Sequence, residues 1–203
     1  MFPLGTVLLP GGVLPLHVFE PRYRQMVVDC LEADGTPEFG QALITHGSEA
    51  GGGDERAMVG TVAQLLQIEA LEGGRYALVA VGTRRLRVNA WLPDDPYPLA
   101  DVDEFPDVDP DPDGLAVQVA ASHARVRAAL ALAAELGDVH VDLAETEIAD
   151  DPPVATYHLS ALAPVGPADR FRLLEAAGPM ERLEVLDAVL DDVEAGLKFR
   201  LSS

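Results

Sequence analysis

The fold of this chain is decided by its opening stretch, FPLGTVLLPGGVLPLHVFEPRYR, residues 2–24. Short apolar runs on either side of Pro10-Gly11-Gly12 are typical of strands separated by a turn, because Gly and Pro interrupt regular structure. Pro21 suits the first position of a helix, where its missing N–H leaves no bond unmade. The apolar residues after it recur at helical spacing: Tyr23, Met26, Val27, Cys30 and Leu31. The stretch therefore predicts strands followed by one amphipathic helix.

Strand patterns continue through the first half of the chain. Apolar runs lie at 39–45 and 58–71, and Gly73-Gly74 joins the second run to the stretch 76–81. Two consecutive glycines can both take positive φ, as a tight hairpin turn requires. Residues 84–92 alternate apolar and polar side chains, which is the period of a half-buried strand. Short strands at this spacing predict an antiparallel barrel or sandwich.

Alternating Pro and Asp mark residues 106–113 as the one biased segment. Proline stiffens the chain and the aspartates repel one another, so the segment predicts an extended linker. A Ca²⁺-binding loop is the alternative, because Asp recurs at every second position before Gly114. Pro110 and Pro112 argue against the turn that such a loop needs, and no Glu closes it at the twelfth position.

After Gly114 the apolar period becomes helical. A first helix is expected from Leu115 to about Gly137, and the others begin at prolines 152, 167 and 179. The last helix carries an apolar seam that must be buried, most simply against its neighbours. The predicted organisation is α+β, with three parts: a β-barrel subdomain at 1–105, a linker at 106–114 and a helical bundle at 115–203.

Composition excludes several classes of protein. The 203 residues hold 14 Lys+Arg against 34 Asp+Glu, a net charge of -20. This balance disfavours nucleic acid and anionic membrane surfaces, which are gripped by cationic side chains. Cys30 is the only cysteine, so no internal disulfide is possible. The first basic residue is Arg22 and no apolar run is long enough to span a bilayer, so we expect no signal peptide, no membrane segment and a cytoplasmic location.

Signatures of catalysis are missing from these residues. The chain has no G-x-x-x-x-G-K-[ST] phosphate loop, and its one lysine, Lys198, follows a leucine. It also has no G-x-G-x-x-G, G-x-S-x-G or H-E-x-x-H pattern. We therefore expect no enzyme activity and no cofactor. Asp138, His140 and Asp142 would share a face if extended, which could suit a metal, but we favour a polar connection between helices and expect no metal site.

One basic cluster interrupts the acidic chain, at Arg75, Arg84, Arg85 and Arg87. Its functional interpretation is a contact with an anion or RNA. The structural interpretation, which we favour, is the solvated face of a strand paired with some of the many acids.

The stretch 2–24 resembles the opening of the Lon protease N-terminal domain, or Lon substrate-binding domain, with its pattern F-P-L-x-x-V-x-x-P-G…L-P-L-x-x-F-E-P-R-Y. Two later segments agree, VGTVA at 59–63 and GRYAL at 74–78, the latter leading to VGTRRL at 81–86. The helical tail around 162–164 and 170–185 is also similar. The resemblance covers nearly the whole chain. It implies a PUA-like antiparallel β-barrel with one helix, followed by a helical bundle.

The resemblance also implies a function: a non-enzymatic module that binds extended or unfolded polypeptide or a partner protein. The chain departs from full-length Lon in lacking the Walker lysine and a Ser–Lys dyad. It therefore looks like a stand-alone Lon N-domain. For such a form the resemblance implies polypeptide binding but not polypeptide degradation. A separate protease is a further partner that this form allows. The alternative function is an RNA-binding PUA-like module, which the negative charge disfavours.

The candidate binding residues lie in the motif itself: Phe19, Glu20, Arg22 and Tyr23. As a recognition surface they would lie where the first helix meets the barrel. Each also has a structural interpretation. Glu20 lies at the cap of the helix that Pro21 begins, where negative charge suits the helix dipole, and Arg22 can pair with Glu20.

Overall fold

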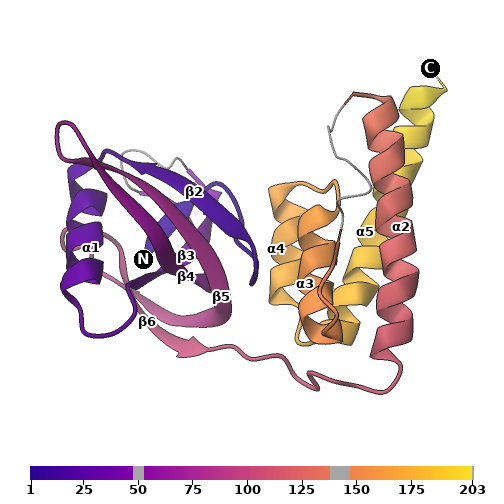
Figure 1. The fold of residues 1–203 in the computed structure, drawn as a ribbon, viewed down its shortest axis with the longest axis horizontal. Coiled ribbons are helices and arrows are strands. Elements are labelled where there is room, and N and C mark those ends of the chain that lie inside the picture. Colours follow the sequence, from indigo (N-terminus) through magenta and orange to yellow (C-terminus); the bar gives the residue numbers. More distant parts are fainter. Residues whose placement is uncertain (48–52, 138–146, 203) are drawn as a thin grey trace. The chain divides into compact units, whose positions relative to one another are not determined.

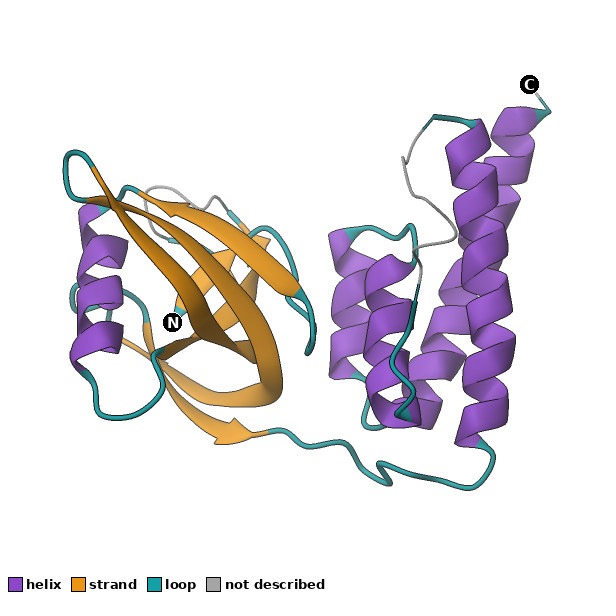
Figure 2. Cartoon of the chain, viewed as in Figure 1, coloured by secondary structure: helices purple, strands orange, loops and turns teal. Residues whose placement is uncertain are grey.

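A computed structural model of the chain describes residues 1–47, 53–137 and 147–202. The chain forms two compact units, Met1–Pro106 and Asp107–Ser203. The first unit contains a β-sheet and helix α1, and the second contains helices α2 to α5 (Figures 1 and 2). The α+β class expected from the sequence, strands first and a helical bundle after them, is confirmed.

Six strands form one sheet in the first unit. They are β1 (Phe2–Leu4), β2 (Val13–Val18), β3 (Glu38–His46), β4 (Glu55–Leu71), β5 (Arg75–Leu92) and β6 (Leu99–Glu104). The order is β1-β3-β4-β5-β2, and β6 also pairs with β5. Strand β5 has 18 residues. This length lets its first part pair with β2, along Tyr76–Val81, and its last part with β6, along Leu86–Leu92.

The sheet differs from an antiparallel barrel in two details. β1 runs parallel to β3, so the sheet is mixed. Its path also ends at β1 and at β2, and the structure pairs neither end with the other. The physical reason lies in the chain between these two strands. Residues 5–12 do not continue β1 as a longer strand that could reach β2; they cross the sheet as a loop.

The apolar run Val7–Leu9, which the sequence suggested as a strand, is this buried loop. Its backbone is satisfied by side chains of the sheet. The Leu8 N–H donates to Gln41 Oε1 at 3.0 Å, and Thr61 Oγ1 donates to the Leu8 carbonyl at 2.6 Å. The loop passes so close to β5 that a Cβ on Gly82 would lie 2.3 Å from the Leu9 carbonyl oxygen. A side chain at this position would therefore force the loop or the strand to move.

Helix α1 (Pro21–Glu32) closes the core of the first unit. Its buried residues Tyr23, Met26 and Val27 occupy the predicted face and pack with the interior of the sheet. Cys30 is half-buried beside the same core, and its Sγ donates to the Glu38 carbonyl at 3.2 Å. Burial raises the pKa of this thiol, which fits a structural cysteine.

The second unit is built from α2 (Leu115–Glu135), α3 (Pro152–Leu162), α4 (Pro167–Glu175) and α5 (Pro179–Leu201). The starts predicted from the prolines agree with these bounds. The apolar seam of α5 is buried within the unit, at Leu183, Leu186, Leu190 and Leu197. No helix in the described ranges combines the length and the hydropathy that crossing a membrane requires.

Part of the segment 106–114 packs on the second unit. Asp107 pairs with the fully buried Arg182, with 2.5 Å between Oδ1 and Nη2. The Arg182 guanidinium also lies 3.6 Å from the centre of the Tyr157 ring and donates to Thr156 Oγ1 at 2.8 Å. The Val108 N–H donates to the Ala177 carbonyl at 2.8 Å. The start of the Pro-Asp segment is thus anchored by a buried cation.

Candidate functional site

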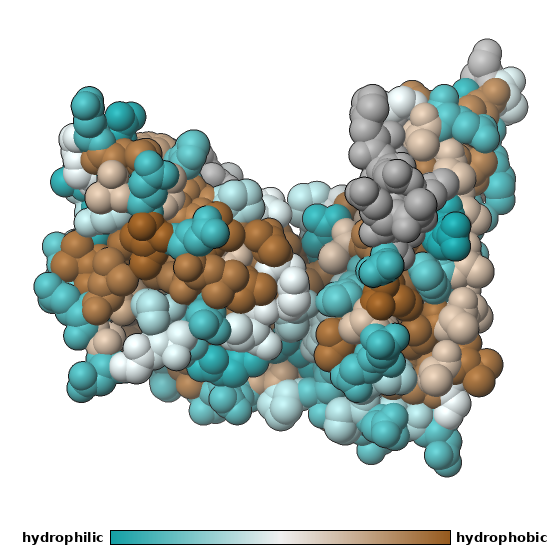
Figure 3. Space-filling view, viewed as in Figure 1, coloured by the Kyte–Doolittle hydropathy of each residue, from teal (hydrophilic) through white to brown (hydrophobic). Residues whose placement is uncertain are grey.

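Strand β2 presents two different faces because its side chains alternate. Leu14 and Val18 point into the core and are buried. Val13 is 65% exposed, and Phe19, directly after the strand, is 64% exposed. Large apolar side chains at this exposure are unusual when several lie together. Figure 3 shows hydrophobic residues gathered on the viewed face of this unit.

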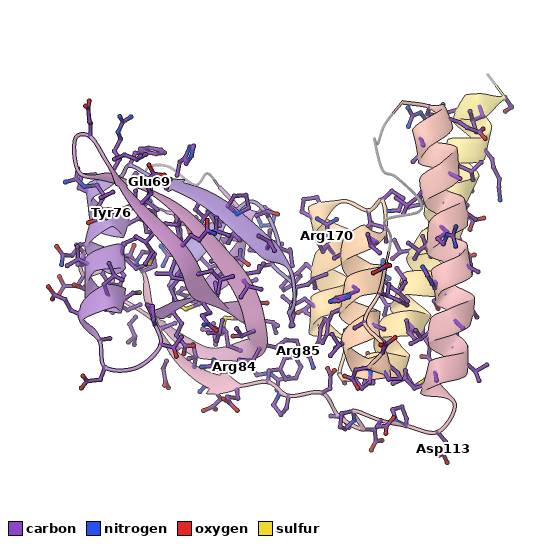
Figure 4. The ribbon with its side chains drawn as sticks, in the orientation of Figure 1. Glu69, Tyr76, Arg84, Arg85, Asp113 and Arg170 are labelled. Atoms are coloured by element: carbon purple, nitrogen blue, oxygen red, sulfur yellow. The ribbon has the colours of Figure 1, made fainter. Side chains whose placement is uncertain are left out.

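A pocket of about 540 Å³ lies over β2, β5 and β4. Its walls are three adjacent strand segments in register: Pro15, Leu16 and His17 of β2, Ala77, Leu78 and Val79 of β5, and Gln67, Ile68 and Glu69 of β4. Glu69 lies near the β4–β5 hairpin (Figure 4). The pocket is therefore mainly apolar with an acidic side chain in its wall.

A second pocket, of about 200 Å³, also borders β2. It is lined by residues of β1 and β2 and of the β2–α1 connection, namely Phe2, Leu4, Leu16, His17, Val18, Phe19, Glu20 and Tyr23. The two pockets share Leu16 and His17. We refer to the two pockets together with the exposed Val13 as the β2 surface.

The backbone of β2 adds hydrogen-bonding groups to this surface. The Gly82 N–H donates to the Gly12 carbonyl at 2.9 Å, so even-numbered residues here face β5. Pro15 has no N–H and can occupy the strand only where it faces away from β5. The N–H and C=O groups of Val13 and His17, and the C=O of Pro15, consequently point to the other edge. Within the described ranges no strand pairs with that edge.

Three of the four residues selected from the sequence line the smaller pocket: Phe19, Glu20 and Tyr23. Phe19 is its exposed apolar side chain. Arg22 is not part of the lining; its Nε donates to Glu20 at 3.0 Å and its guanidinium lies over the Tyr23 ring at 4.5 Å. Glu20 is the N-cap residue of α1 but makes no capping bond with its side chain. Arg22 thus orients Glu20 at the rim of the pocket.

Tyr23 is mainly a core residue. It is 4% exposed, and its ring stacks on Phe2 with 4.2 Å between ring centres. Desolvation raises the pKa of Tyr23 to about 12, with the nearby Arg22 lowering it and Glu20 raising it to smaller extents. The ring forms the floor of the small pocket, and its phenol stays neutral at physiological pH.

Three arginines of the basic cluster make ion pairs or aromatic contacts within the first unit. Arg84 pairs with Glu38 at 2.6 Å and with Glu104 at 3.3 Å. Arg85 is buried although its strand position is polar, and its guanidinium lies 4.1 Å from the centre of the Phe105 ring. Arg84 and Arg85 are labelled on β5 in Figure 4. Pairing with acids was the preferred interpretation of this cluster, and Arg84 shows it.

Groups that could hold a metal ion do not assemble in the part of the chain that the structure describes. No three His, Cys, Asp or Glu side chains there could hold a metal ion. Asp138, His140 and Asp142, suggested above as a metal site, lie outside the described residues. His158 accepts a hydrogen bond from the Ala149 N–H at Nδ1, 3.2 Å away, as expected for a structural histidine.

Residue patterns alone did not identify most of the β2 surface. The larger pocket requires β2, β5 and β4 to be adjacent, and the residues that it brings together are up to 64 positions apart in the sequence, as Pro15 and Val79 are. The available signal was the alternation of Val13, Pro15 and His17 with buried neighbours. This alternation places two apolar side chains, Val13 and Pro15, on an outer face, where polar ones are usual.

The sequence and the fold of this chain are similar to those of known proteins. A family model described as the ATP-dependent protease La (LON) substrate-binding domain matches residues 1–191. The chain resembles the crystal structure of a Lon N-terminal domain protein from Xanthomonas campestris, with a TM-score of 0.63 and 29% identity over 92% of this chain and 95% of that one. It shares its fold with the N-terminal domain of a Mycobacterium avium complex Lon protease, with a TM-score of 0.67 and 22% identity over 94% and 97% of the two chains.

Longer relatives contain a similar region. A Lon protease of Cytophaga hutchinsonii is 30% identical over 107 residues, which are 53% of this chain and 13% of that protease. A Schizosaccharomyces pombe protein named as a LON peptidase N-terminal domain and RING finger protein is 23% identical over 99% of this chain, which spans 47% of that protein. The chain therefore corresponds to a minor part of each.

Proposed function

Because the chain belongs to the ATP-dependent protease La (LON) substrate-binding domain family, we propose that it binds extended segments of polypeptide at the β2 surface. The segment would add a strand beside β2. Main-chain hydrogen bonds would supply affinity, and the two pockets would select side chains. The observation that supports this proposal most directly is that one edge of β2 is paired with no strand among the described residues and has two pockets beside it.

The edge suits strand addition because of its hydrogen-bonding groups. Val13 and His17 each offer an N–H and a C=O, spaced as the alternate residues of a partner strand require. Pro15, between them, offers only a carbonyl. Isolated Pro on an edge strand limits indiscriminate pairing between sheets. Tight binding of a partner therefore requires side-chain contacts in the pockets as well as main-chain hydrogen bonds along the edge.

Charge should set the preference among segments. Glu69 lies in the wall of the larger pocket and Glu20 in that of the smaller one, within a chain of net charge -20. Opposite charge favours encounter and like charge opposes it. Segments that alternate apolar and basic residues should therefore bind better than apolar segments with acidic residues.

The test uses the whole chain labelled with ¹⁵N and a ten-residue peptide of alternating valine and lysine. The peptide should shift the amide signals of Val13 and His17 more than those of the β5–β6 pair. Val13→Asn and Phe19→Asn should each raise the dissociation constant at least tenfold, since each places a polar group among apolar contacts without changing the charge. Met58→Asn is the matched control, because Met58 is an exposed apolar residue of the same sheet, outside both pockets.

Two results would contradict the proposal. One is the absence of amide shifts near β2 at high micromolar peptide. The other is equal weakening by Met58→Asn and by the two β2-surface variants. In either case the chain would bind its polypeptides elsewhere.

A further inference from the structure

The helical unit contains a cavity of about 640 Å³ that the proposed function does not use. Its walls come from all four helices and from the α3–α4 connection. The apolar lining includes Leu130 and Ala133 of α2, Leu162 of α3, and Val193 and Leu197 of α5. Pockets of this size and character typically hold small molecules.

Arg170 lies in the first turn of α4 and lines this cavity (Figure 4). Its Nε is buried and has no hydrogen-bond partner among the residues that the structure describes. Desolvation lowers the pKa of Arg170 below its usual value. A buried N–H that loses water without gaining an acceptor is costly.

Three other arginines of the unit are paired with acids. Arg182 is paired with Asp107, Arg125 with Asp187 and Asp191, and Arg172 with Asp169. This contrast occurs in a chain with more than twice as many acids as bases. Acidic partners are therefore plentiful, yet Arg170 has none in the described part of the unit.

The charges around the cavity favour an anion. Arg170 and Arg200 lie in its lining, with Asp192 as the acid among the lining residues. Arg200 and Asp192 are exposed, whereas the buried Nε belongs to Arg170. Among the described residues of the lining, the charge is thus net positive, although the chain has a net charge of -20.

We propose that this cavity binds a small organic acid with an apolar body, such as a medium-length alkyl carboxylate. The carboxylate would accept hydrogen bonds from Arg170, whose planar fork matches two carboxylate oxygens. The alkyl chain would lie against the apolar walls supplied by α2, α3 and α5. This site is separate from the β2 surface and does not depend on the function proposed for it.

Decanoate is the probe, used below its micelle concentration with the whole chain and calorimetric detection. It should bind, and 1-decanol, which lacks the charge, should bind at least tenfold more weakly. Arg170→Gln should weaken decanoate at least tenfold and leave decanol unchanged. Arg172→Gln is the matched control, because Arg172 is an exposed arginine of the same helix that pairs with Asp169, and it should not change either affinity.

A second pair of variants tests the cavity itself. Gly196 lines the cavity, and a Cβ built on it meets no atom within 4 Å, so Gly196→Phe can fill the space without a clash at Cβ. It should abolish decanoate binding. Ala195→Phe, one residue earlier and exposed, is the matched control and should retain binding. Urea unfolding of all four variants confirms that each is folded.

Three outcomes would overturn the inference. Decanoate does not bind, or it binds equally after Arg170→Gln and Gly196→Phe, or a peptide ending in leucine binds here through its free carboxylate while decanoate does not. The last result would assign the cavity to polypeptide ends. None of them bears on peptide binding at β2, which is measured with a different probe and different variants.

Discussion

At the scale of single residues, Arg182 shows why a buried charge can fix a segment in place. The guanidinium is fully buried, and its donors are taken by Asp107, Thr156 and the Leu173 carbonyl. Removing one partner of such a network leaves the other buried without compensation. The effect should therefore be far larger than for an ion pair on the surface.

We predict that Asp107→Ala lowers the free energy of unfolding of the helical unit by about 3 kcal/mol, in the range for breaking a buried pair. Asp169→Ala breaks the exposed pair with Arg172 and should cost less than about 1 kcal/mol. Urea unfolding followed by helical circular dichroism measures both values. Equal effects would mean that Asp107 is not anchored as the structure shows.

Tyr23 gives a prediction about pH. Burial raises its pKa to about 12, from 10.0 for an unburied tyrosine. Above pH 10 the unfolded chain releases this proton while the folded chain retains it up to about pH 12, so the unfolded state becomes favoured as pH rises. Stability should therefore fall between pH 10 and 12, by up to about 1.4 kcal/mol per pH unit from this group.

Tyr23→Phe should remove this part of the alkaline loss, since Phe keeps the ring stacked on Phe2 and has no proton to release. Tyr97, whose pKa is also raised to about 12, would still contribute to the slope. Urea midpoints at pH 9, 10 and 11 make the comparison. A slope unchanged by Tyr23→Phe would show that the phenol is not desolvated in the folded chain.

At the scale of elements, the sequence predicted those helices whose bounds and buried faces are set by neighbouring residues. The face of α1 and the starts of the later helices follow from residue spacing and from prolines. The sequence did not predict the path of residues 5–12, because this path depends on hydrogen bonds with Gln41 and Thr61, more than thirty residues away. An apolar run such as Val7–Leu9 fits a strand or a buried loop equally well.

The close crossing of this loop over β5 provides a test at the same scale. Gly82→Ala would place a Cβ 2.3 Å from the Leu9 carbonyl, so either the loop or the strand must move. We expect a loss of about 1 to 3 kcal/mol, as for overpacking in a core, together with shifted amide signals in β2. Gly196→Ala should instead stabilise by about 0.5 to 1 kcal/mol, because its Cβ meets nothing and Ala favours helix. Urea unfolding measures the sign of both changes in the free energy of unfolding. If Gly82→Ala leaves this free energy unchanged, the close crossing of the loop over β5 is contradicted.

At the scale of the whole molecule, the division into two units was visible in the change of period near residue 114, and the structure divides the chain between Pro106 and Asp107. The β2 surface was only partly visible. Three of its residues were selected because they belong to a motif, while the larger pocket arises from strand neighbours that no local pattern reveals. Burial of Arg85 on a polar strand face was likewise hidden, because it depends on the distant Phe105.

The net charge of the chain leads to a last prediction, about how salt changes peptide selection. Raising the ionic strength from about 0.1 M to about 1 M shortens the screening length from about 10 Å to about 3 Å. The affinity of the valine–lysine peptide should then fall severalfold, while a valine–glutamate peptide, weaker at low salt, should gain. A valine–serine peptide should change little, because its binding depends on strand pairing and apolar contact. If all three affinities respond alike to salt, then Glu20, Glu69 and the acidic surface play no part in selection, and the pockets alone discriminate.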